Sequence, residues 1–100
     1  EIMRAGAVQP LVHLLKSKDT AGKTAAASVL ARLAADANNQ MEIAHAGALE
    51  PLVQLFRTGN AEGKIYSARA LRSLALHNKN RIKIMCFGVV EPLVQLLQTG

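Results

Sequence analysis

The sequence has very few of the residues that build disulfide frameworks, thiolate metal clusters and aromatic cores. Among its 100 residues there are one cysteine, no tryptophan and three aromatic side chains. The single thiol, Cys86, excludes an internal disulfide and a multi-cysteine metal site. The hydrophobic half of the chain is rich in Ala and Leu, which favour helices over sheets. Length and composition therefore predict a single all-α domain over residues 1–100.

Long apolar runs and a basic leader segment are also missing. No stretch approaches the roughly 20 apolar residues that a helix needs to cross a bilayer. The first residues do not combine a basic segment with an apolar run, as a secretory signal does. The lone cysteine points to a reducing compartment, so we expect an intracellular protein, cytoplasmic and/or nuclear, with no membrane partner. A net charge of +5 favours acidic partners.

The chain contains three near copies of one 11-residue segment, which is called the phrase below. "AGAVQPLVHLL" begins at Ala5, "AGALEPLVQLF" at Ala46 and "FGVVEPLVQLL" at Phe87. The glycines and the prolines of the three phrases recur every 41 residues, and so do many positions between them. A fixed period of this length is typical of stacked helical repeats, in which no unit buries its apolar face alone.

Each period divides into three predicted helices. The phrase itself carries an apolar stripe at i, i+3, i+4 and i+7, with its proline in the first turn of the helix. Asp19 and Asn60 then cap a longer helix that runs to about Asp36 or His77. The apolar stripe of the first helix comprises Val8, Leu11, Val12 and Leu15, then Leu49, Leu52, Val53 and Phe56; that of the longer helix comprises Ala27, Leu30, Leu33 and Ala34, then Ala68, Leu71, Leu74 and Ala75.

A short third helix closes each period. We expect Asn39 and Asn80 to cap it, and the glycine of the next phrase to end it in a left-handed turn.

These segments together resemble the armadillo repeat family. The glycine, proline and Leu-Val of the phrase match its pattern, as do "KTAAASVLARLA" with "ANNQMEI" and "KIYSARALRSLA" with "NKNRIKI". HEAT repeats share the period but not this signature. The resemblance implies a right-handed α-solenoid, with one repeat at about 1–38 whose short helix is truncated, a second at about 39–79 and a partial third at about 80–100.

The partial third repeat lacks a long helix, so the chain is expected to be a fragment or a minimal array. Its last apolar residues have no long helix of their own repeat to cover them. They either pack on the second repeat or are covered by another copy, which would make a homodimer through the uncapped C-terminal helix. The residues concerned are Leu93, Val94, Leu96 and Leu97.

Motifs for catalysis are absent. "SKDTAGKT" ends like a phosphate-binding loop, but Ser17 stands where that motif needs its first glycine, and a predicted helix precedes it. His13, His45 and His77 have no metal-binding spacing, and nothing in the sequence activates Cys86 as a nucleophile. We expect no enzymatic activity, no catalytic residue, no metal and no cofactor.

The resemblance instead places function on the long helices, which line a concave groove that holds extended peptides in this family. The corresponding groove residues are Thr24, Ser28, Arg32, Ile65, Arg69 and Ser73. Members of the importin-alpha type hold Lys-rich signals with Trp at the second and Asn at the third of these groove positions on each long helix. Here those positions hold only Ser and Arg, which would not clamp a basic peptide.

The charge pattern favours an acidic partner. From Lys64 through Lys83 there are six Lys or Arg residues and no Asp or Glu. Guanidinium groups pair well with carboxylates and phosphates, and beta-catenin-like members of the family hold acidic segments. We therefore predict a non-enzymatic module that binds an extended, acidic peptide. Two alternatives stay open, namely nucleic-acid or phosphate binding through the basic stripe and a purely structural or self-associating scaffold segment.

Overall fold

The computed structural model describes the backbone of residues 5–87, and residues 1–4 and 88–100 lie outside the description. Helices make up almost all of the described chain, and it contains no strand, which confirms the all-α prediction. The helices are α1 (Ala5–Leu15), α2 (Thr20–Ala34), α3 (Ala37–His45), α4 (Leu49–Thr58) and α5 (Ala61–Leu74), and the backbone is helical again over residues 78–87.

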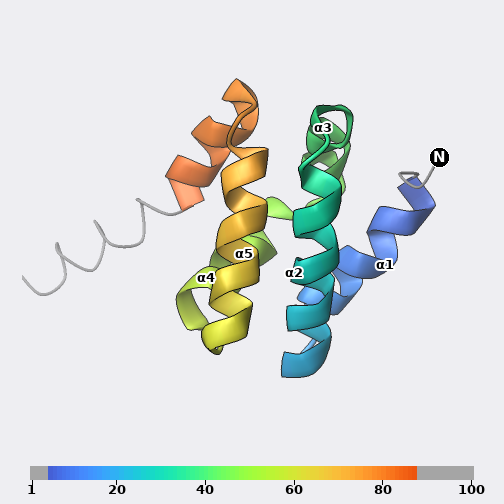
Figure 1. The fold of residues 1–100 in the computed structure, drawn as a ribbon, viewed down its shortest axis with the longest axis vertical. Coiled ribbons are helices and arrows are strands. Elements are labelled where there is room, and N and C mark those ends of the chain that lie inside the picture. Colours follow the sequence, from blue (N-terminus) through green and yellow to red (C-terminus); the bar gives the residue numbers. More distant parts are fainter. Residues whose placement is uncertain (1–4, 88–100) are drawn as a thin grey trace, which may run out of the picture.

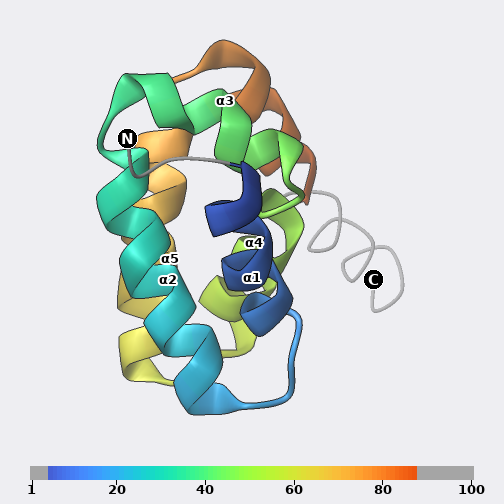
Figure 2. The same cartoon turned by 90° about the vertical axis from the view of Figure 1, so that its right-hand side faces the viewer.

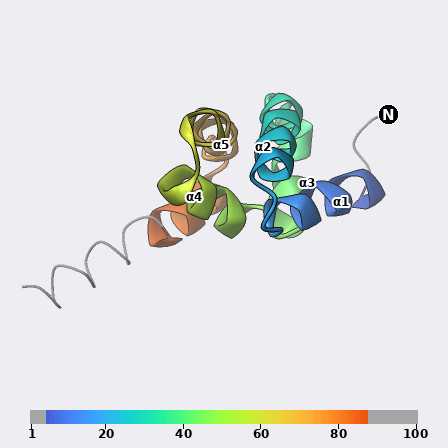
Figure 3. The same ribbon diagram turned by 90° about the horizontal axis from the view of Figure 1, so that it is seen from below.

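The helices form two layers (Figures 1 and 2). The long helices α2 and α5 lie side by side in one layer, while α1, α4 and the segment 78–87 lie in the other (Figure 3). Helix α2 packs against α5, α1 packs against α2, and α4 packs against α5. The first and second helices of each repeat thus pack in the same way, α1 on α2 and α4 on α5. The right-handed superhelical twist and the exact repeat boundaries stay predictions.

Side-chain caps start the long helices at the predicted residues. The Asp19 side chain accepts a hydrogen bond from the Ala21 amide at 3.2 Å, and the Asn60 side chain accepts one from the Gly63 amide at 2.7 Å. Each cap satisfies an amide that has no partner within its helix. The long helices end earlier than predicted, at Ala34 and Leu74 rather than near Asp36 and His77.

The prediction that Asn39 and Asn80 cap the short helices is wrong. Asp36 caps α3, because its side chain accepts a hydrogen bond from the Asn38 amide at 3.0 Å. Asn39 instead donates to the Leu33 carbonyl at 2.9 Å, and Asn80 donates to the Gln40 carbonyl at 3.2 Å. Both amides are buried, where a hydrogen bond offsets the cost of removing them from water. Asn80 therefore joins the segment 78–87 to α3 of the preceding repeat.

The glycine and proline predictions hold in the second phrase and not in the first. Gly47 has a φ of +91° just after α3, the left-handed turn that was expected. Pro51 is in the first turn of α4, where its missing N–H breaks no helical bond. Helix α1, however, begins at Ala5, so Gly6 lies within it and Pro10 lies beyond its first turn. Gly88 lies outside the described residues.

The core lies between the two layers and across the junction of the repeats. The predicted stripes supply most of it, although Leu11, Leu33, Ala68 and Ala75 are only half-buried. Phe56 is a clear exception, since 48% of it is exposed whereas Leu15, its counterpart in the first repeat, is 3% exposed. Helix α4 packs against α1, the helix that carries Leu15. No described element covers Phe56 in the same way.

Leu30 offers a direct test of this core. It is fully buried at the centre of α2, whereas its neighbour Val29 is 40% exposed. We expect Leu30→Ala to lower the free energy of unfolding by about 2–5 kcal/mol, through lost burial and the cavity left behind. Val29→Ala, the matched control, should change it by about 0.5 kcal/mol or less. Urea unfolding followed by circular dichroism measures both, and equal losses would contradict the packing described.

A second pair of variants tests whether Asn39 acts as a buried hydrogen-bond donor and Asn60 as a helix cap. Asn39→Asp should lower the free energy of unfolding by about 1–3 kcal/mol, because a carboxylate cannot donate to the Leu33 carbonyl. Asn60→Asp should be close to neutral, since a carboxylate accepts the Gly63 amide equally well and suits a helix N-terminus. Thermal or urea unfolding of the two variants checks this. A tolerated Asp at position 39 would restore the capping interpretation.

Candidate functional site

A pocket of about 370 Å³ lies between the two long helices. Three of its lining residues come from α2, one directly follows α2, and four come from α5. The lining residues are Ser28, Ala31, Arg32 and Ala35 from α2 and its C-terminal end, and Tyr66, Arg69, Arg72 and Ser73 from α5. The pocket therefore exists only where two repeats meet.

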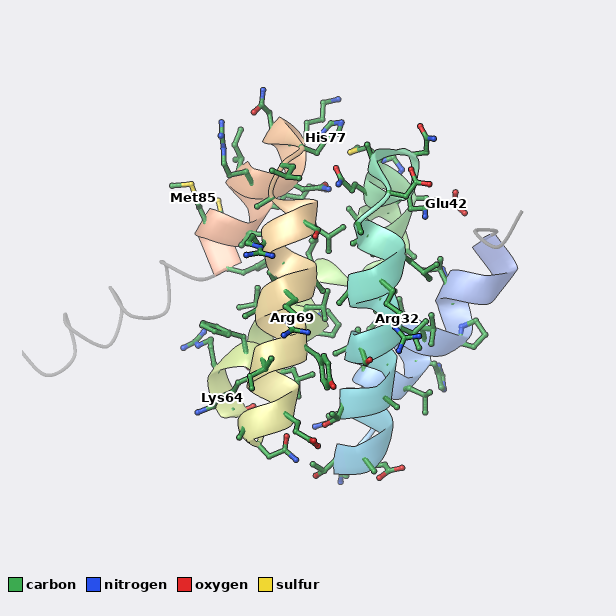
Figure 4. The ribbon with its side chains drawn as sticks, viewed as in Figure 1. Arg32, Glu42, Lys64, Arg69, His77 and Met85 are labelled. Carbon is green, nitrogen blue, oxygen red and sulfur yellow. The ribbon has the colours of Figure 1, made fainter. Side chains whose placement is uncertain are left out.

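Four of the six predicted groove residues line this pocket, namely Ser28, Arg32, Arg69 and Ser73. In the 41-residue register Ser28 corresponds to Arg69, and Arg32 corresponds to Ser73. At these two corresponding positions each long helix has one arginine and one serine, in opposite order. Figure 4 shows Arg32 and Arg69 at about the same level of their two helices.

The other two predicted residues do not line the pocket. The Thr24 hydroxyl donates to the Thr20 carbonyl at 2.9 Å, a bond within its own helix. Ile65 is 51% exposed and lies one turn before Arg69 on α5. Both therefore belong to the same pair of helices without belonging to the pocket.

Sequence reasoning missed Arg72 and Tyr66 as parts of the site. Arg72 corresponds to Ala31 in the first repeat, so the repeat pattern gave no reason to select it. The available signal was local, because Arg72 follows Arg69 by three residues and Tyr66 precedes it by three, which places all three on neighbouring positions of one helical face. The structure brings them together with Arg32 from the other helix.

The pocket is strongly positive. It is lined by three arginines and by no acidic residue, and all three arginines are exposed to solvent. The Arg69 guanidinium carbon lies 5.9 Å from the centroid of the Tyr66 ring, within the range of a cation–π interaction. This contact restricts the Arg69 side chain. A guanidinium group presents several N–H donors in a fixed fork, which suits carboxylate and phosphate oxygens.

An apolar pocket of about 540 Å³ also borders α5, and Arg72 lines both this pocket and the one between α2 and α5. Its apolar lining includes Val53, Phe56, Leu71 and Ile84. The residues 41 positions earlier, Val12, Leu15, Leu30 and Ile43, are all buried in the core. In the first repeat this face is covered by the second repeat. The apolar pocket is therefore the equivalent stacking face of the second repeat.

A third pocket, of about 580 Å³, lies in the layer of the shorter helices. Lys16, Lys23 and Lys83 line it together with Glu50 and the aromatic ring of Phe87. Its charges are of mixed sign, and its basic residues are lysines, which hold an anion as point charges rather than as forks. The pocket between α2 and α5 is the stronger candidate for a specific contact.

The described residues offer little for other kinds of site. No group of three or more His, Cys, Asp or Glu within the described part of the chain could hold a metal ion. Cys86 is exposed and carries a free thiol. None of the described helices is both long enough and apolar enough to cross a membrane.

Comparison with known proteins agrees with the repeat pattern. The family model for the armadillo/beta-catenin-like repeat matches residues 1–35 and 36–76. Comparison with curated proteins and with solved structures finds no match. The two matched segments together span most of the chain, and each ends close to the end of a long helix. This chain belongs to the armadillo/beta-catenin-like repeat family.

Proposed function

We propose that the chain is a non-enzymatic interaction module that binds an extended, acidic segment of a partner protein along the outer face of α2 and α5. The observation that carries the proposal is the pocket with three arginines and no acidic side chain. Armadillo repeats are generally protein-interaction scaffolds and are typically not enzymes, which supports the first part of the proposal. An intracellular setting, cytoplasmic and/or nuclear, is proposed with it.

Arg32 and Arg69 are the proposed anchors. They come from different helices, so a ligand that contacts both must cross from one repeat to the next. Packed helices lie about 8–10 Å apart, and an extended chain advances about 3.3 Å per residue. An extended segment therefore spans one helix spacing in about three residues. Acidic side chains two or three residues apart can then reach the two guanidinium groups, which form charge-assisted hydrogen bonds with carboxylates.

Nucleic-acid binding is the main rival, because a basic surface also attracts phosphodiester chains. Single-stranded nucleic acids are usually held by free aromatic faces on which bases stack. Tyr66 is the only aromatic residue of α2 and α5, and the Arg69 guanidinium lies over its ring. The face of the ring that Arg69 covers is not free for a base. This favours a peptide over an oligonucleotide.

Self-association was the other expectation for this chain. The apolar residues of the C-terminal helix on which it depended lie outside the described residues, so a homodimer through that helix stays a prediction. A scaffold segment without a ligand is the remaining alternative, and the experiment below includes it as an outcome.

Titration of labelled ligands tests the proposal. A fluorescent acidic peptide and a single-stranded oligonucleotide of equal charge are compared at about 50 mM and about 200 mM salt. We expect the peptide to bind more tightly and to retain more of its affinity at the higher salt. Arg69→Glu should weaken peptide binding at least about tenfold, the value of one charge-assisted hydrogen bond.

Arg81→Glu is the matched control. It makes the same change of charge at an exposed arginine that does not line the pocket. Its effect on peptide binding should be small. Tighter oligonucleotide binding, weakened equally by both substitutions, would support the nucleic-acid alternative instead. Binding of neither ligand would mean that this chain acts as scaffold.

A further inference from the structure

We infer that the pocket between α2 and α5 selects a phosphorylated Ser or Thr side chain over an Asp or Glu side chain. The inference rests on the proposed function, since it concerns which anionic group of a bound segment enters the pocket. It adds a chemical class, the phosphomonoester dianion, to a site that is otherwise defined only as basic.

The charges of the lining residues favour a phosphomonoester over a carboxylate. Arg32, Arg69 and Arg72 contribute three positive charges to one pocket, and no lining residue is negative. A single carboxylate carries one charge and two oxygens, which one guanidinium fork can fully engage. The charges of two arginines of the pocket would then remain uncompensated. A phosphomonoester carries about −1.5 to −2 charges near neutral pH and three terminal oxygens, which matches the three arginines better.

The arginines that line the pocket come from both long helices. Arg32 lies on α2, while Arg69 and Arg72 lie on α5. Arg69 is restrained by its contact with Tyr66, which lowers the entropy lost when it engages a ligand. Ser28 and Ser73 add one hydroxyl from each helix. A tetrahedral group can accept from both sides at once, whereas a planar carboxylate offers its oxygens in one plane.

The pocket has a volume of about 370 Å³, which is large for a single carboxylate. That space holds a phosphorylated side chain together with bridging waters. A short carboxylate side chain would leave much of it to solvent, where screening weakens the pairing with the more distant arginines.

Phosphodiester groups of nucleic acids do not fit the same argument. A phosphodiester carries one negative charge, so it presents the same mismatch to three arginines as a carboxylate does. Its affinity comes instead from many phosphates along a chain, with a strong dependence on salt. The pocket is a single concave site at one repeat junction, bounded by two alanines and two serines as well as the arginines.

Four peptides of one sequence test the inference by fluorescence anisotropy. Their central position is Ser, phosphoserine, Glu or a pair of Glu residues, the last providing a total charge close to that of the phosphopeptide. We expect the phosphopeptide to bind at least about tenfold more tightly than either Glu peptide, since it gains one or more charge-assisted hydrogen bonds. The Ser peptide should bind most weakly.

Arg72→Gln should remove most of the preference for phosphate, because the lost charge lowers the affinity for the dianionic phosphopeptide more than the affinity for the single-Glu peptide. Arg72 is exposed, so the variant should fold, and its melting temperature verifies this. Lys79→Gln removes the same charge at an exposed residue that does not line the pocket, and it should leave the preference intact.

The dependence on pH provides an independent readout. The second pKa of a phosphomonoester is about 6, so lowering the pH from about 7.5 to about 5.5 reduces its charge towards −1. The preference should shrink over this range. Glu has an ordinary pKa of about 4.3, so binding of the single-Glu peptide should change much less.

The outcomes separate the inference from the proposed function. Equal binding of phosphoserine and Glu peptides, with both lost in Arg69→Glu, would overturn the inference and leave the acidic-segment function standing. Tighter binding of the double-Glu peptide than of the phosphopeptide would overturn it as well. Failure of all four peptides to bind would overturn the inference and the proposed function together.

Discussion

The packing of α2 against α5 is the contact on which both the core and the candidate site depend. On its inner side the contact involves small buried residues, among them Ala26, Ser67 and Ala70, which let two long helices approach closely. On its outer side the same approach brings arginines from two repeats around one pocket. Neither repeat has the pocket by itself. The apolar driving force that stacks the repeats therefore also concentrates positive charge on the surface.

Much of this architecture could be predicted because its signals are local and repeated. The caps Asp19 and Asn60 and the left-handed Gly47 each follow from the conformational preference of one residue type. Repetition of these signals at a constant spacing identified the fold class. The same reasoning failed at Asn39 and Asn80, because an asparagine near a helix start is usually a cap. Their burial follows from tertiary contacts, which a preference for one position in a helix does not report.

The site was predictable in part for a related reason. Alignment of the two long helices selected Ser28, Arg32, Arg69 and Ser73, which line one pocket. It could not select Arg72, whose counterpart in the first repeat is Ala31. It also gave no sign that Tyr66 lies beneath Arg69. Residues that differ between repeats give each repeat junction its own side chains. Alignment of one repeat on the next does not select such residues, because it relies on positions that are similar.

The buried amide of Asn80 has a mechanical consequence. It donates to the Gln40 carbonyl, and the Gln40 side chain donates to the Ala34 carbonyl, so a short relay of hydrogen bonds links the segment 78–87 through α3 to the end of α2. The relay lies at the end of the long helices where α3 packs (Figure 1). Buried hydrogen bonds are directional and lose strength quickly with displacement, so the relay resists sliding of one repeat along the other. These hydrogen bonds thus oppose sliding of α2 and α5 along each other at one end of the two helices. They help to fix the relative height of Arg32 and Arg69, although neither residue takes part in them.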